Sequence, residues 1–151
     1  MTTRVERLDD LASFVGKELG SSLWIDIDQA RINSFAHATD DHQWIHVDVE
    51  RAKDGPFGET IAHGYLTLSL LIPMWTSILE VHDVHTIVNY GLNKVRFPSP
   101  VPSGSRIRAH ATLAGFEAVP GGAQLTIDIL VERQGSDKPA CVAQLVFRYL
   151  N

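Results

Sequence analysis

Asp41 and His46 are the residues whose types and spacing point to acid–base chemistry, because they lie five positions apart in the segment DDHQWIHVD at residues 40–48. An imidazole with an unperturbed pKa of about 6.5 exchanges a proton near neutral pH. A neighbouring carboxylate orients the imidazole, or takes a proton itself if burial raises its pKa. A pair that holds one water molecule suits the addition of water to a carbon–carbon double bond, or its removal. The same spacing also occurs in solvated loops, and Asp40 competes with Asp41 for the carboxylate role.

A metal site is an alternative use of the histidines in this segment. His42 and His46 are four positions apart, as are the zinc-binding histidines of a helical HExxH motif. Here the string is HQWIH, so Gln43 stands where the general base of such enzymes would be, and the sequence offers no evident third ligand. We therefore expect no metal, and we expect His42 at the surface or beside the site.

A second candidate segment, IAHGYLTLSLL, follows at residues 61–71. Gly64 is expected to begin a buried helix, and the backbone N–H groups of Ala62, His63 and Gly64 are expected to form an oxyanion site. A helix N-terminus presents unpaired N–H groups and the positive end of the helix dipole, which together favour a developing oxyanion. A glycine also lets a ligand carbonyl approach the backbone closely. The alternative is that Gly64 only permits tight packing, and His63 is expected to have a structural or positioning role.

The elements that must position these segments follow from hydrophobic periodicity and turn residues. Residues 40–48 are expected to form a turn or loop, and Asp26 or Asp28 is expected to cap the helix before it. We predict helices at residues 5–19, 29–39, 49–55 and 62–81, and strands at residues 21–27, 86–100, 105–119, 123–135 and 138–150. The helix at residues 62–81 is apolar on nearly every side, which is typical of a helix that is buried all round. The sequence therefore predicts an α+β fold in which an antiparallel meander wraps around one central helix.

The bulk composition favours a single globular domain of 151 residues. A formal charge of −5 disfavours nucleic acid as a partner. Cys141 is the only cysteine and lies in an apolar run, so we expect it to be buried and reduced. The first residues lack the apolar stretch of a secretory signal, and Pro73 interrupts the longest apolar run, which is too short to span a bilayer. We therefore expect a cytoplasmic protein that does not enter the membrane.

The two segments together resemble the hydratase motif of the MaoC-like, (R)-specific enoyl-CoA hydratases. That motif has Asp, any residue, Asn, Pro, an aliphatic residue and His, followed later by Ala or Val, His and Gly. In this chain Asp41, Ile45, His46, His63 and Gly64 match it in order and spacing. Gln43 stands where Asn is usual, and Trp44 stands where Pro is usual, so substrate length and rate are the properties that these two changes put in doubt.

The resemblance implies a single hot-dog domain over residues 1–151, with a curved antiparallel sheet around a long central helix. It implies that Asp41 and His46 hold the water that adds to a trans-2-enoyl-CoA, giving an (R)-3-hydroxyacyl-CoA. It places Gly64, with His63 and Gln43, at the substrate and its oxyanion. No cofactor is implied, since CoA is part of the substrate, and dimers joined edge to edge are usual for such domains.

Three other functions stay open on the same fold. They are a dehydratase acting on acyl carrier protein, an acyl-CoA thioesterase and a non-catalytic acyl-binding protein. The absence of an acidic residue between Gly64 and Leu79 disfavours the thioesterase, which needs a carboxylate near this helix. The candidate residues for an acyl channel are Phe57, Tyr65, Leu68, Trp75 and Ile78, and those for the CoA phosphates are Lys94, Arg96, Arg106 and Arg108.

Overall fold

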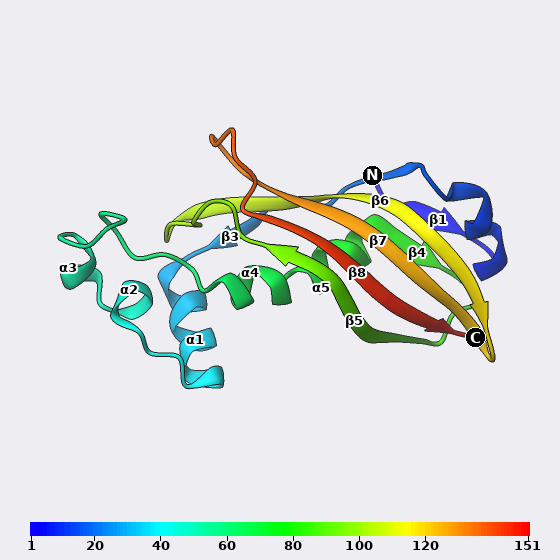
Figure 1. Ribbon diagram of the computed structural model, residues 1–151, viewed down its shortest axis with the longest axis horizontal. Coiled ribbons are helices and arrows are strands. Elements are labelled where there is room, and N and C mark those ends of the chain that lie inside the picture. The colour runs from blue at the N-terminus through cyan, green and yellow to red at the C-terminus, as the bar shows by residue number, and fades with distance from the viewer.

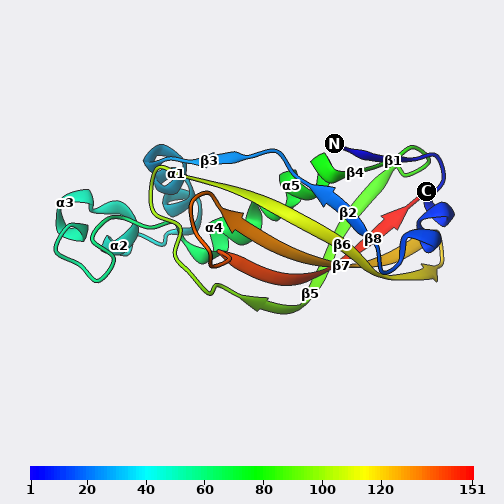
Figure 2. The same cartoon turned by 90° about the horizontal axis from the view of Figure 1, so that it is seen from above.

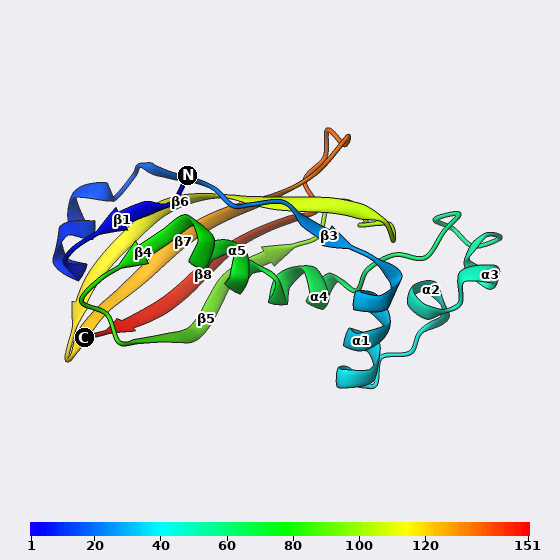
Figure 3. The ribbon, with the colours of Figure 1, turned by 180° about the vertical axis from the view of Figure 1, so that it is seen from behind.

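A computed structural model describes all 151 residues of the chain. The helices are a 3-10 helix η1 (Leu8–Phe14) and the α-helices α1 (Gln29–Thr39), α2 (Trp44–Val47), α3 (Val49–Ala52), α4 (Gly64–Ser69) and α5 (Leu71–Ile78). The strands are β1 (Thr3–Val5), β2 (Glu18–Ser21), β3 (Ile25–Ile27), β4 (Leu79–Val81), β5 (Thr86–Arg96), β6 (Ser105–Val119), β7 (Gly122–Arg133) and β8 (Cys141–Leu150). The expected α+β architecture is confirmed, with α4 and α5 lying end to end along one face of a curved sheet (Figure 1 and Figure 3).

The main sheet is antiparallel, and its strands are ordered β2-β6-β7-β8-β5, with β3 also paired to β6. The strands β6, β7 and β8 form the expected meander, but β5 does not continue it. It pairs with β8 at the far edge instead of with β6, its neighbour in sequence. The connection contains Pro98, Pro100 and Pro102, which lack N–H donors, and it runs from β5 at one edge past β8 and β7 to β6 instead of forming a tight hairpin.

One face of the sheet supplies half of the core because side chains alternate between its two faces. In β6 the buried residues Ile107, Ala109, Ala111 and Leu113 are two positions apart. The burial in β7 has the same period. The helix α5 covers this face with Leu71, Met74, Trp75 and Ile78, all of them buried. Cys141 is buried as expected, and burial raises the pKa of its thiol to about 11.

The central helix is divided at Leu70, which is a difference from the single helix predicted over residues 62–81. Pro73 has no N–H to donate to the carbonyl of Ser69, so the helical hydrogen-bond ladder is interrupted there. Beyond the break, Trp75 Nε1 donates a hydrogen bond of 2.8 Å to the buried hydroxyl of Tyr149 in β8. This contact fixes α5 against the sheet. None of the helices has both the length and the apolar character needed to cross a membrane.

The helix predicted over residues 5–19 is wrong. The chain there forms the strand β1, the 3-10 helix η1 and the strand β2. Leu8 and Leu11 are buried as a helical spacing requires, and a 3-10 helix satisfies the same spacing. Gly16 then takes a φ of 84°, which ends the helical segment before β2 begins. The strand β1 pairs in parallel with β4, a contact between distant segments that local periodicity does not reveal.

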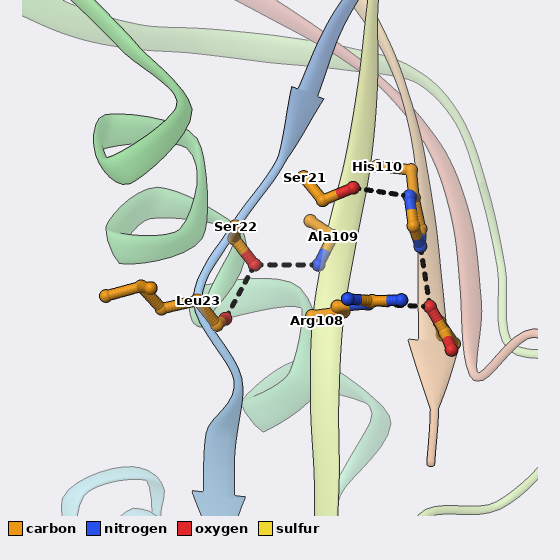
Figure 4. A network of polar contacts seen from close by, with 7 residues as sticks. Ser21, Ser22, Leu23, Arg108, Ala109 and His110 are labelled. Atoms are coloured by element: carbon orange, nitrogen blue, oxygen red, sulfur yellow. Dashed lines mark hydrogen bonds and ion pairs between the residues drawn. The ribbon is translucent and has the colours of Figure 1, made fainter. Parts of the chain in front are cut away.

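The strand expected over residues 21–27 is interrupted over residues 22–24: Ser21 is the last residue of β2, and only Ile25–Ile27 form β3. Ser22 Oγ accepts a hydrogen bond of 2.9 Å from the backbone N–H of Ala109 in β6 and donates to the carbonyl of Leu23 (Figure 4). The Ser22 hydroxyl therefore accepts the β6 hydrogen bond that a backbone carbonyl of a continuous strand would otherwise accept.

A chain of polar contacts ties β2, β6 and β7 together on the outer face of the sheet. Ser21 Oγ lies 2.8 Å from Nδ1 of His110, a contact that is drawn as a dashed line in Figure 4. Nε2 of His110 lies 2.6 Å from the Glu132 carboxylate. Arg108 Nε donates to the same carboxylate oxygen at 2.8 Å. The hydrogen bond from Arg108 has the largest effect on the Glu132 carboxylate, and the one from His110 comes next. Together they hold the pKa of Glu132 below its usual range.

We expect this network to stabilise the fold only while Glu132 is ionised. A lowered folded-state pKa gives stability that is present above the unfolded pKa of about 4.3 and is lost as the pH falls through the folded value. Because Glu132 is partly exposed, Glu132→Gln should lower the free energy of unfolding at pH 7 by about 1 kcal/mol at most. Urea unfolding of the wild type and of Glu132→Gln should show that the difference between their free energies of unfolding becomes smaller below about pH 4.3. A difference of unchanged size at pH 3 would contradict the assignment.

Candidate active site

The helices α1, α2 and α3 gather at one end of the molecule, beyond the long strands, and β3 leads directly into α1 there (Figure 2 and Figure 3). Asp28 caps α1 by accepting a hydrogen bond of 2.8 Å from the N–H of Arg31, so of the two aspartates proposed for this cap it is Asp28 that forms it. The helix ends at Asp40, whose φ of 58° is the only positive value outside glycine. Asp40 therefore turns the chain, and Asp41 is the aspartate that the turn delivers toward His46.

His46 lies in the short helix α2 and is 7% exposed. Its Nδ1 is 2.7 Å from the carbonyl oxygen of Ile61, which only accepts, so Nδ1 carries the hydrogen and Nε2 has the free lone pair. Burial, the largest effect, lowers the pKa of His46; the nearby Asp41 and the bond to Ile61 oppose this shift. At neutral pH the side chain is thus a neutral imidazole with a proton acceptor at Nε2.

His63 is buried beside this imidazole. The two rings stack with centroids 3.9 Å apart and planes 23° apart, and Phe35 packs against the far side of His63 at 4.9 Å. His63 Nε2 donates a hydrogen bond of 3.0 Å to the backbone carbonyl of Asp41, and its Nδ1 has no partner. One side-chain oxygen or nitrogen from each of Asp41, His46 and His63 lies within 4.8 Å of the others. The structure thus brings these three predicted residues together.

The stacking makes this cluster a poor metal site. A zinc ion lies close to the plane of each imidazole that binds it, at about 2 Å from the nitrogen. Two rings that are stacked and nearly parallel do not share such a point, because their lone pairs run side by side. His42, the other half of the HxxxH spacing, is exposed and contacts the ring of His37. The absence of a metal stays a prediction, and the ring geometry favours it.

Gly64 begins α4, as predicted. Its surroundings are consistent both with a role as an oxyanion donor and with a role in tight packing. The N–H groups of Leu66 and Thr67 bond to the carbonyl of His63, while those of Gly64 and Tyr65 have no protein partner. A Cβ at Gly64 would lie 3.1 Å from the ring of Phe97, so the glycine also permits close packing. Ala62 is a correction to the predicted donor set, because its N–H already bonds to the carbonyl of Val101.

A cleft of about 330 Å³ opens beside Gly64. Its lining is mostly apolar and includes Phe57, Thr67 and Phe97. Of the five residues proposed for an acyl channel, Phe57 is the one found there. Trp75 and Ile78 are wholly buried in the core, and Tyr65 is exposed, so these three assignments are not supported.

Gln43 and Trp44 contribute to the site through the backbone and through packing. The Gln43 carbonyl accepts the N–H of His46 at 3.0 Å, while its exposed side chain makes no hydrogen bond. Trp44 lies over Gly55, where a Cβ would come within 2.8 Å of the indole, and Arg51 stacks on the same ring at 4.3 Å. Trp44 therefore braces the segment that carries α2 and α3.

The four basic residues proposed for the CoA phosphates differ in their surroundings. Arg106 pairs with Asp26 at 2.9 Å and Arg108 pairs with Glu132, so both are already engaged on the sheet. Lys94 and Arg96 are exposed on β5 and make no ion pair. The contributions of the Ile61 carbonyl and of Phe97 were not predicted, and no local pattern in the sequence marks either one.

A curved antiparallel sheet around a central helix, with an Asp–His cluster at the N-terminal end of that helix, defines a hot-dog protein of the dehydratase type. The MaoC-like domain model matches residues 10–132, and the chain belongs to this family of MaoC-like dehydratases. It is 53% identical over 146 residues to the 3-hydroxyacyl-thioester dehydratase Z of Mycobacterium tuberculosis (strain ATCC 25618 / H37Rv), covering 96% of this chain and 97% of the relative.

Solved structures agree with the fold. A MaoC-like dehydratase from Rhodospirillum rubrum has a TM-score of 0.76 at 24% identity and covers 96% of this chain and 97% of its own. The R-hydratase PhaJ1 of Pseudomonas aeruginosa has a TM-score of 0.74 at 21% identity, covering 91% and 82%. The family and the hot-dog fold that the sequence implied are thus confirmed.

Proposed function

We propose that this protein is an (R)-specific hydratase that adds water to trans-2-enoyl-CoA, giving (R)-3-hydroxyacyl-CoA, and that also runs the reverse dehydration. The observation that carries the proposal is the cluster of Asp41, His46 and His63, in which Nε2 of His46 is free, together with the N–H of Gly64, the residue after His63, which has no protein partner. The name of the Mycobacterium tuberculosis relative, a 3-hydroxyacyl-thioester dehydratase, supports the same reaction class.

In this mechanism Asp41 and His46 hold one water molecule between them. One of the pair accepts a proton from the water as the water oxygen bonds to the β-carbon, and the pair then returns a proton to the α-carbon on the same face, so the elements of water are added in full. The thioester carbonyl gains negative charge as the water attacks. The Gly64 N–H, at the positive end of α4, would stabilise that charge. CoA is part of the substrate, and no further cofactor is required.

A thioesterase is less well supported by the site. Such an enzyme needs a carboxylate that directs water at the thioester carbon, and α4 and α5 contain no acidic residue. Glu80, the first acid after them, lies in β4, is half exposed and pairs with Arg4 at 3.0 Å. It is therefore committed elsewhere.

The test is to incubate the purified protein with crotonyl-CoA. We expect loss of the enoyl absorbance, formation of the (R)-3-hydroxy product by chiral analysis and no release of free thiol. Release of CoA without hydration would favour the thioesterase, and no reaction on any chain length would favour an acyl-binding protein. The same assay with crotonyl-acyl carrier protein, compared by kcat/KM, decides between the two carriers, which the relative's name leaves open.

We also infer that the protein acts as a homodimer. The strand β5 has no partner on its outer edge and exposes Ile87, Val88, Tyr90 and Leu92. An open edge with apolar side chains is a liability that a second copy would remove. Light scattering of the protein in solution should give twice the chain mass of 16.7 kDa, and a monomer at micromolar concentration would contradict the inference.

Gly64→Ala is expected to weaken substrate binding more than the fold. The new Cβ meets the Phe97 ring at 3.1 Å, so the ring must move by a few tenths of an ångström into the cleft where the acyl thioester would lie. We expect KM to rise by about three- to tenfold, with the melting temperature changed little. Steady-state kinetics beside thermal unfolding measures both. An unchanged KM would mean that Phe97 does not line the substrate path.

The pH dependence should follow His46. Its neutral form is the one that accepts a proton, and burial lowers its pKa, so the neutral form persists to lower pH than in a free imidazole. The acid limb of the kcat/KM profile should therefore lie below about pH 6.5. Initial rates from pH 4.5 to 8 measure this limb. A midpoint above 7 would show that another group controls the rate.

A further inference from the structure

Gln29 is the first residue of α1, and its side-chain amide makes three hydrogen bonds. Its Nε2 donates to the backbone carbonyl of His46 at 2.7 Å and to Asn33 Oδ1 at 2.9 Å. Its Oε1 accepts the hydroxyl of Thr60 at 2.7 Å. Both amide hydrogens are used, and this pattern of donors and acceptors fixes which way the amide faces.

These bonds connect the two segments that determine where His46 lies. Thr60 is 3% exposed and directly precedes Ile61, whose carbonyl accepts the Nδ1 hydrogen of His46. The Gln29 amide thus holds the backbone of His46 on one side and the residue next to its ring acceptor on the other. Gln29 is thus linked to both ends of His46. One hydrogen bond reaches the His46 backbone carbonyl, and the other reaches Thr60, which is joined by a peptide bond to Ile61, the acceptor of the His46 ring.

The short helix α2 needs such external support. It has only four residues, Trp44–Val47, and its Gln43 N-cap makes no side-chain hydrogen bond. A helix of this length is not stable by itself, because its few backbone bonds do not offset the cost of nucleation. The orientation of His46 therefore depends on contacts from other segments, and α1 provides one from a helix that is itself capped by Asp28.

We propose that Gln29, with Thr60, is a positioning residue that holds the imidazole of His46 in its working orientation. The inference rests on the proposed function, since it assigns Gln29 to the water-activating side of that site. Gln29 does not touch the substrate in this arrangement. It acts through the backbone of His46, and a displacement of that ring by about 1 Å costs on the order of a hundredfold in rate.

The test uses Gln29→Met, which keeps the length of the side chain and removes the amide, and Thr60→Val, which keeps the shape and removes the hydroxyl. Each should lower kcat by about 10- to 100-fold while KM changes by less than about threefold. Thr60→Ser, which retains the hydroxyl, should recover most of the kcat that Thr60→Val loses. Gln134→Met, the same change on an exposed turn residue, is the control and should match the wild type.

A spectroscopic reading that needs no turnover separates this inference from the proposed function. The Nδ1 hydrogen of His46 should give a slowly exchanging downfield proton resonance, assigned by its loss in His46→Gln. Gln29→Met and Thr60→Val should shift it and speed its exchange with water. Normal kcat, or a lost kcat with this resonance unchanged, would overturn the positioning role. If the wild type hydrates no enoyl thioester, the proposed function fails, and the resonance still decides whether Gln29 orients His46.

Discussion

Asp41→Asn and His46→Gln are each expected to lower kcat/KM for the hydration of crotonyl-CoA by about 10²- to 10⁴-fold, the range typical of a general acid or base. His46→Gln removes the lone pair at Nε2, and Asp41→Asn removes the negative charge beside it. Neither change opens a large cavity, since both new side chains are close in size to the old ones. The loss in kcat/KM should therefore be in transition-state stabilisation.

The matched control for His46→Gln is His110→Gln. His110 is also held by hydrogen bonds, to Ser21 and Glu132, but it lies on the outer face of the sheet. Its variant should retain activity within about twofold, as expected for a residue outside the reacting groups. If Asp41→Asn and His46→Gln hydrate crotonyl-CoA at wild-type rates, the pair is not the catalytic one.

The double variant gives a sharper reading of the same pair. Two groups that hold one water molecule act as a unit, so removing both should cost little more than removing the worse one. Losses that multiply would mean that Asp41 and His46 contribute separately. The slow variants are measured by following the enoyl absorbance for longer times at high enzyme concentration.

The parts of this fold that were predictable are those whose residues interact with near neighbours in sequence. The strand at residues 105–119 was predicted with its observed bounds, because a strand-like apolar run and the flanking Ser–Gly and Pro–Gly turns are local signals. The helix at residues 29–39 was predicted for the same kind of reason, with a capping aspartate at its start. The joint presence of Asp41 and His46 in one cluster follows from their short separation along the chain.

What the sequence did not reveal depends on contacts between distant segments. The parallel pair of β1 and β4, the placement of β5 beside β8 and the ring of Phe97 over Gly64 all join residues more than thirty positions apart. The predicted Ala62 donor failed for the same reason, because its N–H is taken by Val101 in a connection that the local pattern does not describe. Gln29 carries no signal of its own, since a glutamine at the start of a helix is unremarkable by composition.

Gly122→Ala is expected to lower the free energy of unfolding by about 3 kcal/mol, at the upper end of the usual cost of overpacking. Gly122 lies at the start of β7 opposite the end of β8. A Cβ there would overlap the backbone carbonyl oxygen of Tyr149 and lie 3.0 Å from the Cα of Leu150. Backbone atoms in a hydrogen-bonded strand do not rotate away as a side chain does, so the two strands must separate.

The separation matters because Tyr149 links the sheet to the central helix. Its hydroxyl accepts the hydrogen bond from Trp75, and burial raises its pKa to about 12, so it stays protonated throughout the working range. Moving the backbone of Tyr149 stretches that bond and leaves two buried polar groups poorly paired, which adds to the steric cost. Gly91→Ala is the control, because a Cβ at Gly91 meets nothing within 4 Å, and its effect should stay within about 0.5 kcal/mol. Equal urea midpoints for Gly122→Ala and Gly91→Ala would show that β7 and β8 can separate near Gly122 without a loss of stability.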